Sequence, residues 1–155
     1  MRYFRNSFLN WRTTTQTCPA MNPTEGEMMK NLTRYVNRQI ERNEGIVKDS
    51  MEDLTRDFNE RFEWLGEQVY KGNLKLEFLR DLSKLLADEE CNIEGARFYL
   101  RHAAEHAADD IMHRDPYRNS SNGAANLTHR WTYESYKDIY HLALNLLDRL
   151  TPDAE

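Results

Sequence analysis

Apolar residues recur in steps of three, four and four from residue 29 to residue 69. Eleven residues over three turns give about 3.67 residues per turn, close to the 3.6 of a straight α-helix. An apolar stripe with this period therefore stays on one face of a helix. We call its twelve positions the seam: Met29, Leu32, Val36, Ile40, Asn43, Val47, Met51, Leu54, Phe58, Phe62, Leu65 and Val69.

The seam predicts one very long helix over about residues 25–71, ended by Gly72 and Asn73. Such a helix would be about 70 Å long at 1.5 Å per residue. Gly45 offers the alternative of two helices broken at that point. It lies roughly opposite the seam, where a missing side chain costs about 1 kcal/mol of helix propensity. Because the seam keeps its phase across Gly45, we expect a single uninterrupted helix.

Three shorter helices are expected after the long one, at about 74–88, 93–113 and 129–150. Asn92 can cap the second of these, and the Asp115-Pro116 pair should end it. No segment alternates apolar and polar residues long enough to predict a strand. The sequence therefore predicts an all-α bundle, with residues 24–155 as a single helical domain and residues 1–23 as an N-terminal arm.

The seam also predicts how the protein acts. Helices shorter than the first would leave part of the seam uncovered, and an open apolar stripe is an association surface. We therefore expect a homo-oligomer with coiled-coil contacts, serving as an interaction, assembly or regulatory protein with a protein partner. Asn43 is either a buried polar residue that fixes register or a residue at a solvated gap. The sequence has no Gly-rich phosphate loop, no G-x-S-x-G and no C-x-x-C, so it favours neither an enzyme nor a cofactor.

The N-terminal arm suggests a second function. Residues 1–24 hold three arginines and no acidic residue, whereas the whole 155-residue chain has a net charge of −5. Arginine binds phosphates and aromatic rings stack on unpaired bases, which predicts contact with nucleic acid, RNA included. The residues are Arg2, Arg5, Phe8, Trp11 and Arg12.

The alternative for the arm is docking on protein. Phe4, Phe8 and Trp11 follow the spacing i, i+4, i+7 of one helical face. That face could pack against the chain's own core or against a neighbouring subunit. The acidic balance of the rest of the chain favours this alternative over a general nucleic-acid binder.

Histidine and aspartate stripes suggest a third function, metal binding. Residues 102–106 match the H-x-x-E-H signature of inverted zinc proteases. The string D-I-x-H occurs twice, as the paired E-x-x-H motifs of di-metal bundles do. The alternative is that both stripes are ordinary solvent faces, since they lie opposite the apolar stripes of their helices. The candidate ligands are His102, His106, Asp109, His113, Asp138 and His141.

The apolar runs and the cysteines of the sequence predict the cellular location of the protein. No apolar run approaches the roughly 20 residues of a membrane helix, so no membrane association is expected. The two cysteines, Cys18 and Cys91, are far apart and lack metal-ligand spacing. Free thiols in a reducing cytoplasm are the expectation.

Overall fold

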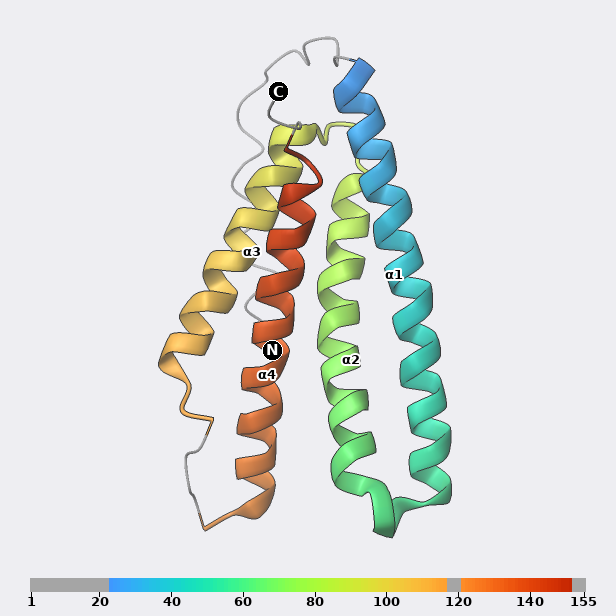
Figure 1. Ribbon diagram of the computed structural model, residues 1–155, viewed down its shortest axis with the longest axis vertical. Helices are drawn as coiled ribbons and strands as arrows, with labels where there is room; N and C mark the ends of the chain where they lie inside the picture. The colour runs from blue at the N-terminus through green and yellow to red at the C-terminus, as the bar shows by residue number, and fades with distance from the viewer. Residues whose placement is uncertain (1–22, 117–120, 152–155) are drawn as a thin grey trace.

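The computed structural model describes residues 23–116 and 121–151 and shows four α-helices that run up and down in succession (Figure 1). No strand occurs in these two ranges. The first helix packs along the second and the third along the fourth, and the two helical hairpins meet mainly through the second and fourth helices. The all-helical bundle expected from the sequence is confirmed. The helices are α1 (Pro23–Arg56), α2 (Phe58–Leu86), α3 (Ile93–His113) and α4 (Gly123–Asp148).

The chain reverses direction at Asp57, between α1 and α2, so the single helix predicted over 25–71 is wrong. Asp57 has φ −122° and ψ 42°, outside the helical region. Its N–H still donates to Asp53 O at 2.9 Å, and its carbonyl accepts from Arg61 N at 3.2 Å. Asp57 and Glu60 form the D-x-x-E pattern typical of a helix start. The seam crosses the turn unbroken because both helices of an antiparallel pair turn their apolar stripe toward each other.

Neither glycine that the sequence singled out interrupts a helix. Gly45 lies inside α1 and Gly72 inside α2. Since α2 continues to Leu86, the helix predicted at 74–88 is the second half of α2. A Cβ atom at Gly72 would lie 2.4 Å from Val47 Cγ2. Gly72 therefore permits close packing of α2 on α1 and does not end a helix.

The second hairpin is closer to expectation. α3 has the bounds predicted at 93–113, and Asn92 caps it, with Oδ1 accepting from the backbone N–H of Gly95 at 2.9 Å. α4 begins at Gly123, before the predicted 129, because Asn122 accepts backbone N–H bonds from its first turn. Both starts follow from asparagine caps, which satisfy N–H groups that have no partner within the helix.

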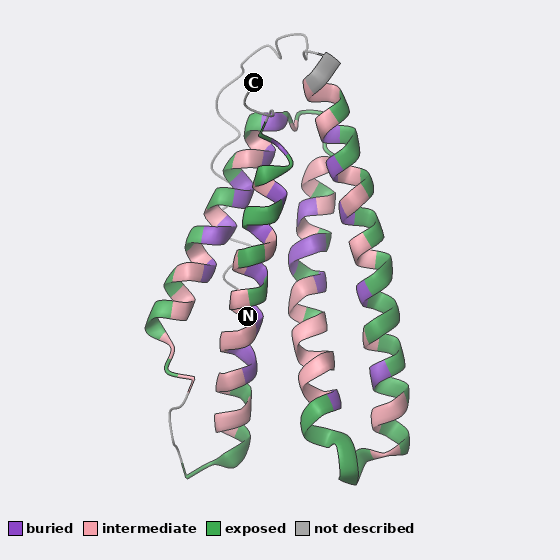
Figure 2. Cartoon of the chain, viewed as in Figure 1, coloured by how far each residue is buried: buried purple, intermediate pink, exposed green. Residues whose placement is uncertain are grey.

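The buried core lies toward the end of the bundle where α1 begins and α2 joins α3 (Figure 2). It comprises Met29, Leu32, Val36, Phe78, Leu79, Leu82, Ile93, Ala96, Tyr99, Leu100, Ala103, Ala104, Ala107, Ile139, Ala143, Leu146 and Leu150. We name residues 49–67, around the α1–α2 turn, the hairpin end. Within it only Ser50 and Leu65 are buried, and α3 stops short of it (Figure 1). The two ends of the bundle therefore differ sharply in packing.

Candidate interaction surface

The turn at Asp57 divides the seam into buried and exposed parts. Five seam residues are buried (Met29, Leu32, Val36, Asn43 and Leu65), and four are half-buried (Ile40, Val47, Leu54 and Val69). Most of the seam is therefore used inside one chain, where α1 and α2 pack on each other. The remaining three seam residues are exposed, and all lie in the hairpin end: Met51, Phe58 and Phe62.

Asn43 is buried in the seam at 7% exposure. Its side-chain Nδ2–H donates to Gln39 O at 2.6 Å, within α1. Its side chain also lines a polar groove described below. The amide thus has its hydrogen-bond partner in its own helix and lies at the edge of the polar groove.

Large apolar side chains are concentrated on the surface of the hairpin end. Met51 is 47% exposed, Phe58 54%, Phe62 41% and Trp64 58%. Half of the exposed large apolar residues in the described part of the chain lie in this short segment. The others lie on α1, α3 and α4, and of these Ile46 lines the polar groove together with Trp64. They are Ile46, Phe98, Met112 and Leu144. Phe58 and Phe62 are in ring contact, whereas Trp64 lines the polar groove described below. Single apolar residues are normal on a protein surface, and neighbouring exposed rings are a candidate contact surface.

A row of aromatic rings connects this surface to the interior. Phe58 and Phe62 have centroids 5.0 Å apart, Phe62 and Trp131 6.3 Å, and Trp131 and Tyr70 5.9 Å. These separations are typical of favourable aromatic pairs. The Tyr70 hydroxyl lies 2.8 Å from Thr132 Oγ1, which ties α2 to α4 at the inner end of the row. The row therefore runs from the α1–α2 turn toward α4.

An apolar hollow of about 390 Å³ lies beside this row. Trp131 is only 7% exposed, and its buried indole Nε1–H has no acceptor among the residues that the structure describes. An unpaired buried donor costs about 1–3 kcal/mol. The interior at this end thus contains a buried polar group without a hydrogen-bond partner in the described part of the chain. The lining residues are Leu54, Phe62, Gly66, Val69, Tyr70, Asn73, Leu74, Glu77 and Trp131.

The hairpin end is also acidic. It carries seven acidic residues and two arginines, a net charge of −5. Three cations from outside the segment reduce this to −2: Lys48 lies 3.9 Å from Glu52, Lys71 lies 3.9 Å from Glu67, and Arg130 lies 2.6 Å from Glu63. The hydrogen bond to Glu63 raises the pKa of Arg130. The segment that carries the exposed apolar side chains therefore has a surplus of carboxylates. Its acidic residues are Asp49, Glu52, Asp53, Asp57, Glu60, Glu63 and Glu67.

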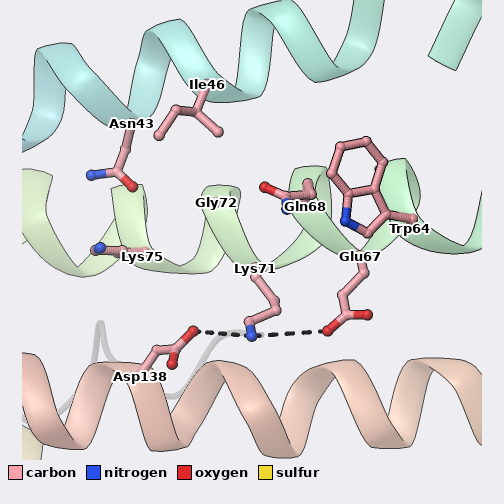
Figure 3. A pocket seen from close by; sticks show the side chains of 9 residues that line it. All are labelled: Asn43, Ile46, Trp64, Glu67, Gln68, Lys71, Gly72, Lys75 and Asp138. Atoms are coloured by element: carbon pink, nitrogen blue, oxygen red, sulfur yellow. Dashed lines mark ion pairs between the residues drawn. The ribbon is translucent and has the colours of Figure 1, made fainter. Parts of the chain in front are cut away.

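A second, polar groove of about 300 Å³ lies between α1, α2 and α4 (Figure 3). Lys71 crosses it, with Nζ 3.1 Å from Asp138 Oδ2 and 3.9 Å from Glu67 Oε1. Lys75 is the second cation of the lining. Two lysines and two carboxylates balance, so the groove has no net charge to select an ionic ligand. The remaining lining residues are Asn43, Ile46, Trp64, Gln68 and Gly72.

The histidine stripe of α3 pairs within its own helix. His113 Nδ1 lies 3.2 Å from Asp109 Oδ1, and His106 Nδ1 lies 3.3 Å from Asp110 Oδ2. The His102 ring stacks on Phe98, with centroids 6.3 Å apart. These are the local i, i+4 contacts of a solvent face, and they do not converge on a point.

The α4 members of the proposed metal set are engaged elsewhere. Asp138 faces Lys71 of α2 in the polar groove, and the His141 ring packs edge-on against Tyr140. No group of three or more His, Cys, Asp or Glu side chains that could hold a metal ion occurs in residues 23–116 and 121–151. The structure thus does not bring the predicted ligand set together.

The predicted nucleic-acid set lies outside the described residues. This holds for Arg2, Arg5, Phe8, Trp11 and Arg12, together with most of the predicted arm, residues 1–23. The seam does not predict Trp64 and Trp131, because neither residue falls on it. The D-x-x-E pattern at Asp57 and the surplus of acids in the segment 49–67 were the two signals that could have located the hairpin end.

The fold and the surface define an all-helical protein of two packed hairpins with one open, apolar and acidic end. Comparison of the chain with known protein families, characterised proteins and solved structures found no match. Among the described helices, none is both long and apolar enough to cross a membrane.

Proposed function

We propose that this protein is a helical interaction protein that assembles through its hairpin end and does not catalyse a reaction. One observation carries the proposal: large apolar side chains gather on the surface of the hairpin end, whereas the core of the bundle lies at the other end. Full burial of a Phe or Met side chain is worth about 1.5–3 kcal/mol. Since Met51, Phe58 and Phe62 are each about half exposed, a partner that covers them gains a substantial part of that free energy.

This proposal revises the surface expected from the sequence. A coiled coil along one long helix needs the whole seam to face a partner, and most of the seam is buried or half-buried within the chain. Only its middle, from Met51 to Phe62, remains open to a partner. Assembly would therefore involve a compact patch at one end of the bundle. The cytoplasm remains the proposed location, because Cys91 is a free thiol.

The mass of the full-length protein in solution, measured by light scattering after size exclusion, tests the proposal. We expect a mass above that of one chain that rises with concentration. Phe58→Asp should return it toward the monomer, because a carboxylate replaces the most exposed phenylalanine of the patch. The variant should still fold, since residue 58 begins α2 and an acidic residue there interacts favourably with the helix dipole.

Phe98→Asp is the matched control. Phe98 is 64% exposed and lies on α3, away from the hairpin end. Its substitution changes charge and apolar surface as Phe58→Asp does, and it should leave the mass unchanged. A wild-type protein that stays monomeric at high concentration would remove the support for assembly. Equal effects of the two substitutions would show that the hairpin end is not special.

A further inference from the structure

We infer that the hairpin end of one chain binds residues 1–22 of the N-terminal arm of a second copy of the same chain. This inference rests on the proposed function and names the partner that covers the open surface. The described part of the chain presents apolar rings within a surplus of carboxylates at this end. Its complement is a segment that combines aromatic side chains with positive charge.

Charge disfavours the simplest alternative, a symmetric contact between two hairpin ends. Each hairpin end keeps a net charge of −2 after Lys48, Lys71 and Arg130 are counted. Bringing two such surfaces together places like charges opposite each other in a contact that excludes water, and this opposes association. The occupant of the hairpin end should therefore be basic.

The arm has the composition that this surface requires. Residues 1–22 contain Arg2, Arg5 and Arg12 and no acidic residue, so their side chains carry +3 against the −2 of the hairpin end. Phe4, Phe8 and Trp11 are spaced to share one helical face. An amphipathic helix that places such anchors in an apolar groove is a common mode of peptide recognition. The hollow of about 390 Å³ beside the aromatic row offers room for one large side chain.

Reach favours a second copy over the same chain. The arm joins the bundle at Pro23, at the start of α1, and Met51 lies near the other end of that helix. The distance along α1 between these two residues is about 42 Å at 1.5 Å per residue. The chain from Trp11 to Pro23 spans at most about 43 Å when fully extended. Trp11 could therefore reach the hairpin end of its own chain only with a taut linker, whereas a neighbouring antiparallel chain brings its hairpin end close to the arm.

Reciprocal exchange closes the assembly. If each of two chains gives its arm to the other, the two contacts are related by a twofold axis and no open site remains. Once one arm is bound, the second arm and its hairpin end are held at a high effective concentration. Two weak contacts therefore stabilise the dimer together. The inference thus predicts a dimer that does not grow into a filament.

Two full-length variants test this arrangement by sedimentation velocity. The arm variant carries Phe8→Asp and Trp11→Asp, and the hairpin variant carries Phe58→Asp. Each alone should raise the dimer dissociation constant by at least about tenfold, because both contacts of the dimer are damaged. A one-to-one mixture should form a mixed dimer, with the intact arm of the hairpin variant bound to the intact hairpin end of the arm variant. That dimer should be weaker than wild type, since it keeps one contact of two.

Other outcomes separate the inference from the proposed function. If the hairpin variant dissociates and the arm variant does not, the hairpin end mediates assembly but the arm is not its occupant. If both dissociate and the mixture does not recover a dimer, the arm does not act on a second copy. If neither variant changes the mass, both the inference and the proposed function are wrong.

The charge contribution and the nucleic-acid alternative need a further variant, Arg2→Ala with Arg5→Ala and Arg12→Ala. It should weaken the dimer, and added salt should weaken the wild-type dimer in the same direction. A 20-nucleotide single-stranded RNA is the competing probe. The inference would be overturned if the substitutions abolished RNA binding but left the dimer dissociation constant unchanged.

Discussion

Gly72 of α2 lies so close to Val47 of α1 that a Cβ atom on the glycine would come within 2.4 Å of Val47 Cγ2. Real Cβ atoms do not tolerate such a distance, so the absence of a side chain sets how closely the two helices of the first hairpin pack. The sequence alone suggested that this glycine ends a helix. Its role in the structure is to let a second helix approach.

Gly72→Ala should destabilise the protein even though alanine is the better helix former. The gain in propensity is about 1 kcal/mol, whereas overpacking a close contact costs about 1–3 kcal/mol. Valine is branched at Cβ and has few rotamers in a helix, so it cannot easily move away. The free energy of unfolding from urea titration is the measurement.

Gly45→Ala is the matched control, because nothing lies within 4 Å of a Cβ atom at Gly45. It should raise the free energy of unfolding by about 1 kcal/mol. Adding Val47→Ala to Gly72→Ala should recover part of the loss through coupling of the two sites. A Gly72→Ala variant as stable as the Gly45→Ala variant would contradict the close packing.

Tyr70→Phe tests the link between the two hairpins. The substitution removes a hydroxyl that lies 2.8 Å from Thr132 Oγ1 and joins α2 to α4. The expected loss is about 0.5–1.5 kcal/mol in the free energy of unfolding. Tyr133→Phe, one residue further along α4, is the control and should change stability by less than about 0.5 kcal/mol. Similar values for the two variants would argue against this hydrogen bond.

Cys91 should react slowly with alkylating reagents in the native protein. Burial, followed by the charge of nearby Asp88, raises the pKa of the thiol from 9.0 to about 11. Only the thiolate is a nucleophile, so at pH 8 the native protein should be alkylated more slowly than the urea-unfolded chain. Peptide mass spectrometry after timed iodoacetamide treatment measures the rate at this residue. Equal rates in the native and unfolded states would contradict the burial.

The same shift of the Cys91 pKa predicts a dependence of stability on pH. The native thiol holds its proton more tightly than the unfolded one, because its pKa is the higher of the two. Its contribution to stability is therefore complete below pH 9 and is lost as the pH rises from about 9 to about 11. Cys91→Ser should show a smaller loss than wild type over this interval when unfolding is followed by circular dichroism.

Hydrogen exchange should distinguish the two ends of the bundle. Amides at 76–82 and 96–104 lie among core residues, whereas few residues at 49–67 are buried. Local opening is easier where few apolar contacts must be broken. In dilute protein, amides near the α1–α2 turn should exchange at least about tenfold faster than those in the core segments. Uniform protection along α1 and α2 would show that the hairpin end is packed as well as the core.

The helical class was readable from the sequence because the apolar period, the low glycine and proline content and the asparagine caps all agree. α3 was placed with its observed bounds since Asn92 and the Asp115-Pro116 pair mark both of its ends. The reversal at Asp57 was not readable from the period. An apolar stripe has the same eleven-residue period in one straight helix and in two helices that fold back on each other. In addition, no glycine or proline marks this turn.

The proposed interaction surface was only partly predictable. The seam predicted Met51, Phe58 and Phe62 as association residues, and these three are exposed. It also predicted an association role for residues that the fold buries within one chain. Trp64 and Trp131 were missed because their importance depends on which helix faces which, and helical spacing within one segment does not contain that information. The histidine stripes show the same limit: residues on two helices share a pattern, yet the packing does not bring them together.

The packing of each helix mainly on its neighbour in sequence has a consequence for biosynthesis. A ribosome releases the chain from its N-terminus, so α1 and α2 can pair once residue 86 has emerged. Contacts between nearby segments form quickly. The face of α2 that packs on α4 stays uncovered until residue 148 is made, roughly 3–12 s later at 5–20 residues per second. During that interval the first hairpin exposes the apolar face of α2. This is the stage of synthesis at which the chain is most prone to aggregate.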